Sequence, residues 1–123
     1  IRENLRYGNS NDISDDKLNE YIKIFDLFNG EAPALDMRIN NKNLSSGQMQ
    51  KISFIRVMLA EVDILFLDES TSNLDTETKN KIYSVLKKLE ITIVNSTHSK
   101  EDFEYDLHLN IKNIEGKRLF NFV

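Results

Sequence analysis

Cysteine is absent from the 123-residue chain, which excludes disulfide scaffolds, thiolate zinc sites and cysteine nucleophiles. No apolar run approaches the roughly 20 residues that a transmembrane helix needs. Only 4 glycines and 1 proline are present, so collagen-like and linker sequences are excluded as well. The 16 basic and 20 acidic side chains give a net charge of −4, which argues against a domain that binds nucleic acid by neutralising phosphates.

What the chain does contain is the composition of one globular domain, with 40% hydrophobic and 29% charged residues. It opens at Ile1, without an initiator Met and without the basic and apolar regions of a signal peptide. We therefore expect it to be a piece of a longer protein.

The first half of the chain has helical patterns. Residues 1–11 are a short polar lead, and residues 14–28 then predict an amphipathic helix that Ser14 caps. Residues 35–43 predict a loop, and residues 46–61 predict a second helix, apolar around much of its circumference and therefore well buried. The apolar positions of the first helix are Leu18, Tyr21, Ile22, Phe25 and Phe28, and Asn29 with Gly30 ends it.

The second half predicts strands. Residues 64–67 form a continuous apolar run that ends in two acids, which is typical of a strand covered on both faces. Residues 76–88 predict a helix and residues 91–94 a second strand, so the three together predict a parallel βαβ unit. Alternation over residues 107–112 predicts a half-solvated strand, and residues 118–123 close a terminal hairpin. The fold class is α/β with a helical portion in front.

The start of the second helix is the first place where chemistry can be sought. It carries small and polar residues, Leu44, Ser45, Ser46, Gly47 and Gln48. Free backbone N–H groups and the helix dipole at such a tip suit an anion, phosphate above all. The alternative is an ordinary serine cap without a ligand.

Three further positions lie around the predicted sheet. Asp68 and Glu69 end the first strand, where parallel sheets place ligands, and point to opposite sides, so one suits a metal ion and the other a water. His98 follows the second strand and is expected at the same edge. Ser72 and Asp75 lie in a turn before a helix. The alternatives are solvated acids, a structural histidine and a capping loop in which Asp75 or the next residue is the N-cap.

These features together form an ordered pattern. Asp68 lies 21 positions after Gly47, and Asp75 and His98 lie 7 and 30 positions after Asp68. In this order the chain resembles the nucleotide-binding domain of ATP-binding-cassette (ABC) ATPases, especially exporters.

The resemblance extends over nearly the whole chain. Residues 44–48 resemble the LSGGQ signature, residues 64–69 the Walker B strand with its catalytic glutamate, residues 72–75 the D-loop, and His98 the H-loop histidine. Residues 1–8 resemble the segment that follows the Q-loop. No G-x-x-x-x-G-K-[ST] loop and no Q-loop glutamine are found.

The resemblance implies a P-loop NTPase (RecA-like) core, of which this is the C-terminal half preceded by the α-helical signature subdomain. Residues 1–61 would form that subdomain and residues 62–123 the half core with Walker B, D-loop, H-loop and terminal hairpin. The phosphate-cradling Walker A half would lie outside the chain.

The resemblance also implies roles for single residues. Asp68 would hold Mg²⁺ through water, while Glu69 and His98 would be catalytic. The nucleotide-binding residues would be Leu44, Ser45, Ser46, Gly47, Gln48, Ser72 and Asp75.

Two departures from the family pattern stand out. Ser46 replaces the first glycine of the signature pair, which would cost roughly 1–2 kcal/mol if that position needs a left-handed backbone. Residues 38–41 read Arg-Ile-Asn-Asn where exporters carry Gly-Glu-Arg-Gly, so this loop departs from the segment that couples exporters to a membrane partner.

The function implied is that of an ATP-hydrolysing domain of an ABC transporter, at the cytoplasmic face of the membrane. Its partners would be a second nucleotide-binding domain, arranged head to tail, and a transmembrane domain, with no nucleic acid. The isolated piece should not hydrolyse ATP. The alternatives are a soluble ABC-type ATPase of DNA repair, chromosome maintenance or translation, and a binding module whose acids are only surface charge.

Overall fold

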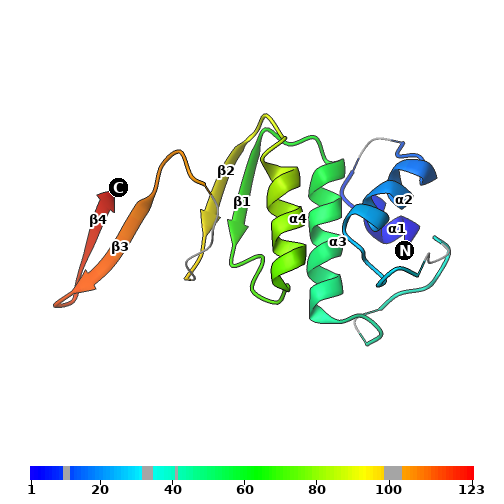
Figure 1. Cartoon of the computed structure of the whole chain (residues 1–123), viewed down its shortest axis with the longest axis horizontal. Helices are drawn as coiled ribbons and strands as arrows, with labels where there is room; N and C mark the ends of the chain where they lie inside the picture. Colours follow the sequence, from blue (N-terminus) through cyan, green and yellow to red (C-terminus); the bar gives the residue numbers. More distant parts are fainter. Residues whose placement is uncertain (10–11, 32–34, 41, 99–103) are drawn as a thin grey trace.

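A computed structural model of the chain describes residues 1–9, 12–31, 35–40, 42–98 and 104–123. Figure 1 shows the hairpin, a two-stranded sheet and then the helices following one another along the long axis. In chain order the elements are α1 (Arg2–Arg6), α2 (Asp15–Ile24), α3 (Ser46–Leu59), β1 (Ile64–Asp68), α4 (Thr76–Leu86), β2 (Thr92–Ser96), β3 (Leu109–Ile114) and β4 (Lys117–Phe122).

The predicted βαβ unit is confirmed. Strands β1 and β2 pair in parallel, from Ile64 opposite Thr92 to Asp68 opposite Ser96, with α4 as the connection that a parallel pair requires. The carboxyl ends of both strands and the N-termini of α3 and α4 lie at the lower edge of Figure 1. The predicted hairpin is also confirmed, since β3 and β4 pair antiparallel.

The helix predicted over residues 14–28 is shorter than expected. Ser14 caps α2 as predicted, accepting a hydrogen bond from the Lys17 N–H at 3.3 Å, but α2 ends at Ile24. Asp26, Asn29 and Gly30 all have positive φ, and a right-handed helix cannot continue through such residues. Residues 25–30 therefore form a chain of turns, although Phe25 stays buried.

The polar lead predicted for residues 1–11 was wrong in one respect, because it contains α1. Leu5 is fully buried, and Ile1 is buried beside it. The helix α1 is in contact with α2 and α3, and its Arg2 and Arg6 pair with Asp15 at the start of α2. These tertiary contacts hold a helix that is too short to be stable alone.

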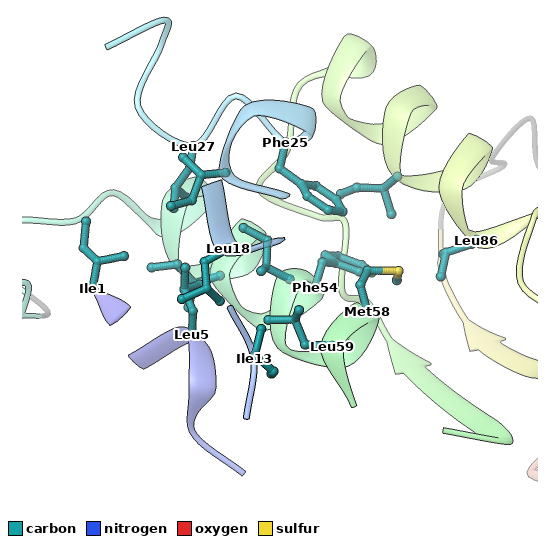
Figure 2. Close-up of a cluster of buried hydrophobic side chains, with 14 of the residues drawn as sticks. Ile1, Leu5, Ile13, Leu18, Phe25, Leu27, Phe54, Met58, Leu59 and Leu86 are labelled. Atoms are coloured by element: carbon teal, nitrogen blue, oxygen red, sulfur yellow. The ribbon is translucent and has the colours of Figure 1, made fainter. Parts of the chain in front are cut away.

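One continuous cluster of apolar side chains holds the helices and β1 together. Figure 2 shows Phe54, Met58 and Leu59 of α3 lying among side chains from α1, α2 and the segments after them. The cluster includes residues from both sides of the boundary predicted between residues 61 and 62, and that boundary remains a prediction.

The prediction that the first strand is covered on both faces was wrong for this chain. Leu65 and Leu67 are buried, whereas Ile64 and Phe66 are 56% and 74% exposed. Their neighbour Val94 on β2 is exposed as well, so one face of the sheet packs on the helices and the other is open.

The hairpin differs from expectation in the same way. The apolar side chains alternate as predicted, and Leu109 and Ile111 lie opposite Phe122 and Phe120, yet all four are exposed.

Among the described residues, no helix combines the length and the apolar character needed to cross a bilayer.

Candidate functional site

Glu69 and His98 meet at the carboxyl edge of the parallel sheet. Glu69 follows β1 directly, and its N–H donates to the Ser96 carbonyl of β2 at 2.9 Å. His98 comes two residues after β2, and its Nε2 lies 2.8 Å from Oε1 of Glu69. The prediction that these two residues lie at the same edge of the sheet is thus confirmed in geometry.

The backbone of Glu69 is in an unusual conformation. Its φ is +45°, in the left-handed region that costs a non-glycine residue energy. The strand is thereby turned sharply after Asp68, and the Glu69 side chain projects beyond the sheet edge toward His98. Strained residues of this kind are concentrated at functional sites.

Asp68 ends β1, opposite Ser96, and its side chain is exposed to solvent. No cluster of three or more His, Asp or Glu side chains that could chelate a metal occurs in the described part of the chain. A single exposed carboxylate nevertheless fits Mg²⁺, because that ion keeps several waters and is often bound by one or two carboxylates together with phosphate oxygens.

The start of α3 is held by a capping box. Ser45 is the N-cap, and its Oγ accepts from the Gln48 N–H at 3.1 Å while Oε1 of Gln48 accepts from the Ser45 N–H at 2.9 Å. Gln48 also donates through Nε2 to the Leu27 carbonyl at 3.2 Å. The serine cap weighed as an alternative is therefore present, and the Gln48 side chain is occupied within the chain.

The cap leaves two amides free of helical partners. Ser46 and Gly47 are the first two residues of α3, and N–H groups at these positions have no acceptor within the helix. Ser46 is exposed and is not among the described residues with positive φ, so the serine at this position carries no left-handed strain. Two free amides at the positive end of a 14-residue helix suit a phosphate.

Leu44, the residue before this cap, packs its side chain against the apolar cluster. An open hollow of about 460 Å³ lies beside the tip of α3. Its lining includes Ser45, Ser46 and Gly47 together with Asn73, Leu74 and Asp75 from the turn before α4. The structure thus brings the start of α3, predicted as a site at residues 44–48, close to residues 73–75 of the turn before α4.

Lys51 was missed by the reasoning from sequence. It lines the same hollow, is only 7% exposed and donates from Nζ to the Asp26 carbonyl at 2.9 Å. Its position one turn after Gly47 on α3 was the available signal. Lys51 brings a positive charge close to the tip while tying α3 to the turns at residues 25–30.

Asp75 is the N-cap of α4, one of the alternatives considered for it. Its two carboxylate oxygens accept from the Thr78 N–H at 2.9 Å and the Thr78 hydroxyl at 2.7 Å. These hydrogen bonds, the one from the N–H first, lower the pKa of the Asp75 carboxyl, and the nearby Lys51 charge adds to the effect. Asp75 is therefore ionised at neutral pH and is exposed at the rim of the hollow.

The turn between Glu69 and Asp75 is linked to α3 by a residue that the sequence did not single out. Gln50 contacts both Ser72 and Asn73 through its side-chain amide. Neither helical periodicity nor motif spacing pointed to this contact, because it joins residues 22 and 23 positions apart.

Comparison with known proteins identifies the family of the chain. The sequence model of the ABC transporter family matches residues 1–72. A putative export ATP-binding/permease protein of Rickettsia conorii is 37% identical over 118 residues, covering 87% of this chain and 20% of that protein. An ABC transporter ATP-binding protein of Bacillus subtilis is 41% identical over 98 residues, covering 72% of this chain and 15% of its own length.

A yeast protein is also similar to the chain. The alpha-factor-transporting ATPase of Saccharomyces cerevisiae is 36% identical over 91 residues, which cover 72% of this chain and 7% of the yeast protein. The chain thus spans a fifth or less of the length of these relatives. The names of the relatives favour a transporter over the soluble ABC-type alternative, and the chain belongs to the ABC transporter family.

Proposed function

We propose that the chain contributes two groups of residues to the ATP sites of an ABC exporter. One is the hydrolysis edge, with Glu69 and His98, and the other is the signature tip, with residues 44–48. The full-length protein would couple ATP binding and hydrolysis to transport, working at the cytoplasmic face of a membrane. Two relatives named as export or transporting proteins support this reading.

The observation that carries the proposal is the 2.8 Å pair between Glu69 and His98 at the carboxyl edge of β1 and β2. Parallel sheets bind ligands at this edge. The Glu69 carboxylate, held in place by the His98 imidazole, can orient an attacking water and accept its proton. The imidazole can also contact a γ-phosphate. Both side chains are exposed, so a nucleotide can reach them.

Asp68, the exposed last residue of β1, would hold Mg²⁺ through water. Bound Mg²⁺ would neutralise charge on the phosphates during transfer. Asp68 is the last residue of β1, whereas the turned backbone of Glu69 directs its side chain toward His98, so the two carboxylates can serve the metal and the water separately.

The tip of α3 would bind an ATP molecule held by a second nucleotide-binding domain, arranged head to tail with the first. The free amides of Ser46 and Gly47 and the hydroxyls of Ser45 and Ser46 are suited to a γ-phosphate. Ser72 and Asp75, next to the tip, would face the partner domain and link the two sites. A transmembrane domain would be the other partner.

The phosphate-cradling Walker A loop is not found among the 123 residues. Since phosphoryl transfer relies on positioning and charge stabilisation, this chain alone should neither bind ATP tightly nor hydrolyse it. Isothermal titration calorimetry on the chain checks this, and micromolar affinity for ATP would contradict it.

The decisive experiment replaces Glu69 by Gln in the full-length protein. Loss of the general base should lower the ATPase rate by about 10²–10⁴-fold while ATP remains bound. Glu90→Gln, the same change at an exposed position outside the site, is the matched control and should keep the parental rate. An unchanged rate in Glu69→Gln would show that Glu69 is not the general base, and a parent protein without any ATPase rate would support instead a binding module whose acids are surface charge.

A further inference from the structure

The contact between Gln50 and the turn before α4 joins two functional segments within one domain. Nε2 of Gln50 lies 3.5 Å from the Ser72 hydroxyl oxygen, to which it donates. Oε1 of Gln50 accepts from the Asn73 N–H at 3.3 Å. A single side chain of α3 thus contacts two successive residues of the turn, once as donor and once as acceptor.

A second contact between the same two segments lies one turn earlier on α3. A Cβ atom at Gly47 would be 3.3 Å from the Asn73 carbonyl oxygen, so the turn runs directly against the backbone of the helix tip. Glycine at this position permits the approach, because a larger residue would push the turn away. Asn73 therefore contacts α3 in two places: its N–H donates to Gln50, and its carbonyl lies against the backbone of Gly47.

Both ends of the turn are attached to parts of the proposed ATP site. The Ser72 N–H donates to the Glu69 carbonyl at 3.1 Å, which ties the beginning of the turn to the hydrolysis edge. At the other end Leu74 is buried and Asp75 caps α4. The middle of the turn, at Ser72 and Asn73, is exposed, and Gln50 is the side chain of α3 that reaches it.

We propose that Gln50 is a positioning residue that makes the turn at residues 70–75 move together with the tip of α3. An ATP molecule bound at the tip then also fixes the turn that leads from Glu69 to Asp75. This inference rests on the proposed function, and it adds a mechanical link between the two ATP sites. The link runs from the tip at one site, through Gln50, to the turn and Glu69 at the other.

The chemistry of the contact determines which substitutions break it. Gln50→Met keeps the length of the side chain and its helix propensity but removes donor and acceptor together. Gln50→Glu keeps an acceptor for the Asn73 N–H and should retain the link. Ser53→Ala is the matched control, because Ser53 lies on the same helix and is exposed, and its hydroxyl donates to the Met49 carbonyl of its own helix.

The test is hydrogen exchange followed by mass spectrometry on the full-length protein in a Glu69→Gln background, with and without Mg-ATP. With Gln50 present, ATP should slow exchange in residues 44–48 and in residues 70–75. In Gln50→Met, protection of residues 44–48 should persist, while exchange in residues 70–75 with ATP bound should be at least about fivefold faster, because both hydrogen bonds from Gln50 to the turn are lost and one alone is worth about that factor. Gln50→Glu and Ser53→Ala should keep both protections.

Other results would overturn the inference. If Gln50→Met, and likewise Gln50→Ala, keeps full protection of residues 70–75, Gln50 does not link the segments. If both segments lose protection in these variants, Gln50 supports ATP binding rather than the link. If ATP protects neither segment even with Gln50 present, the proposed function itself fails.

Discussion

Replacing Asp75 by Ala should remove the cap of α4 and lower the free energy of unfolding. The carboxylate accepts two hydrogen bonds from Thr78, one of them from the backbone N–H that would otherwise lack an acceptor. Loss of an N-cap side chain costs about 1 kcal/mol, within a range of roughly 0.5–2 kcal/mol. Asp75 is exposed, so no larger contribution from its charge is expected.

The pH dependence of this cost has a definite sign. Hydrogen bonds from Thr78 hold the pKa of Asp75 below its ordinary value of 3.8 in the folded chain. The unfolded chain therefore takes up the proton first as the pH falls. The stabilisation is fully present well above pH 3.8 and is lost as the pH falls through the lowered pKa. The difference in the free energy of unfolding between the parent chain and Asp75→Ala should accordingly shrink as the pH falls below 3.8.

The assay is urea unfolding followed by far-ultraviolet circular dichroism, between pH 7 and pH 3. Asp75→Asn is the informative companion, because Asn caps helices about as well as Asp but carries no charge. It should keep most of the stability at pH 7 and lose the pH-dependent part. A cost below about 0.3 kcal/mol for Asp75→Ala at pH 7, or a cost that does not fall with pH, would refute the reasoning.

Three further predictions concern the chain itself. Ile55→Ala, at a fully buried position of α3, should lower the free energy of unfolding by about 2–5 kcal/mol. Met49→Ala, at a position 38% exposed on the same helix, should change that free energy by about 0.5 kcal/mol or less. Equal costs of the two substitutions in urea unfolding would contradict the burial of Ile55. Ser45→Ala should cost about 1 kcal/mol through the lost capping box, and a cost no larger than that of Ser53→Ala would argue against it. The exposed sheet face should make the chain self-associate, so light scattering should give a mass above the 14.3 kDa of one chain. The Phe66→Ser variant should give a lower mass than the parent chain. A monomer at every concentration of the parent chain would disprove this prediction.

Local chemistry made much of the fold predictable. Ser14 and Ser45 begin helices because each offers a side-chain acceptor where backbone donors are unpaired. The apolar run at residues 64–67 and the β-branched run after α4 pair in parallel, which is the pairing that a helical crossover between two neighbouring strands permits. From that topology alone, Glu69 and His98 were expected at one edge, where the structure places them.

Other features left no periodic signal. The helix α1 has a single turn and one apolar residue within it, Leu5, which is too little for a 3.6-residue period to be detected. The early end of α2 depends on positive φ at Asp26, a residue with no preference strong enough to predict it. Apolar residues at Ile64 and Phe66 predicted burial, but hydrophobicity shows only that a face can be covered, not which segment covers it.

The site was predicted unevenly for the same reason. Its acids, serines and histidine carry chemistry that can be sought by residue type and spacing. Lys51 and Gln50 act instead through long side chains that reach carbonyls, amides and hydroxyls far along the chain. Such contacts depend on tertiary packing, so motif spacing did not reveal them, although Lys51 stands one helical turn after Gly47.

The central claim is that the tip of α3 in one domain and Glu69 of its partner act on the same ATP molecule. The most direct measurement is the ATPase rate of mixed dimers, in which one full-length copy carries Gly47→Asp and the other Glu69→Gln. In a head-to-tail pair one site then keeps both an intact tip and an intact Glu69. The mixed dimers should hydrolyse ATP well above the rate of either variant paired with itself. If they are as inactive as the two matched dimers, the tip and Glu69 do not serve one nucleotide across the interface.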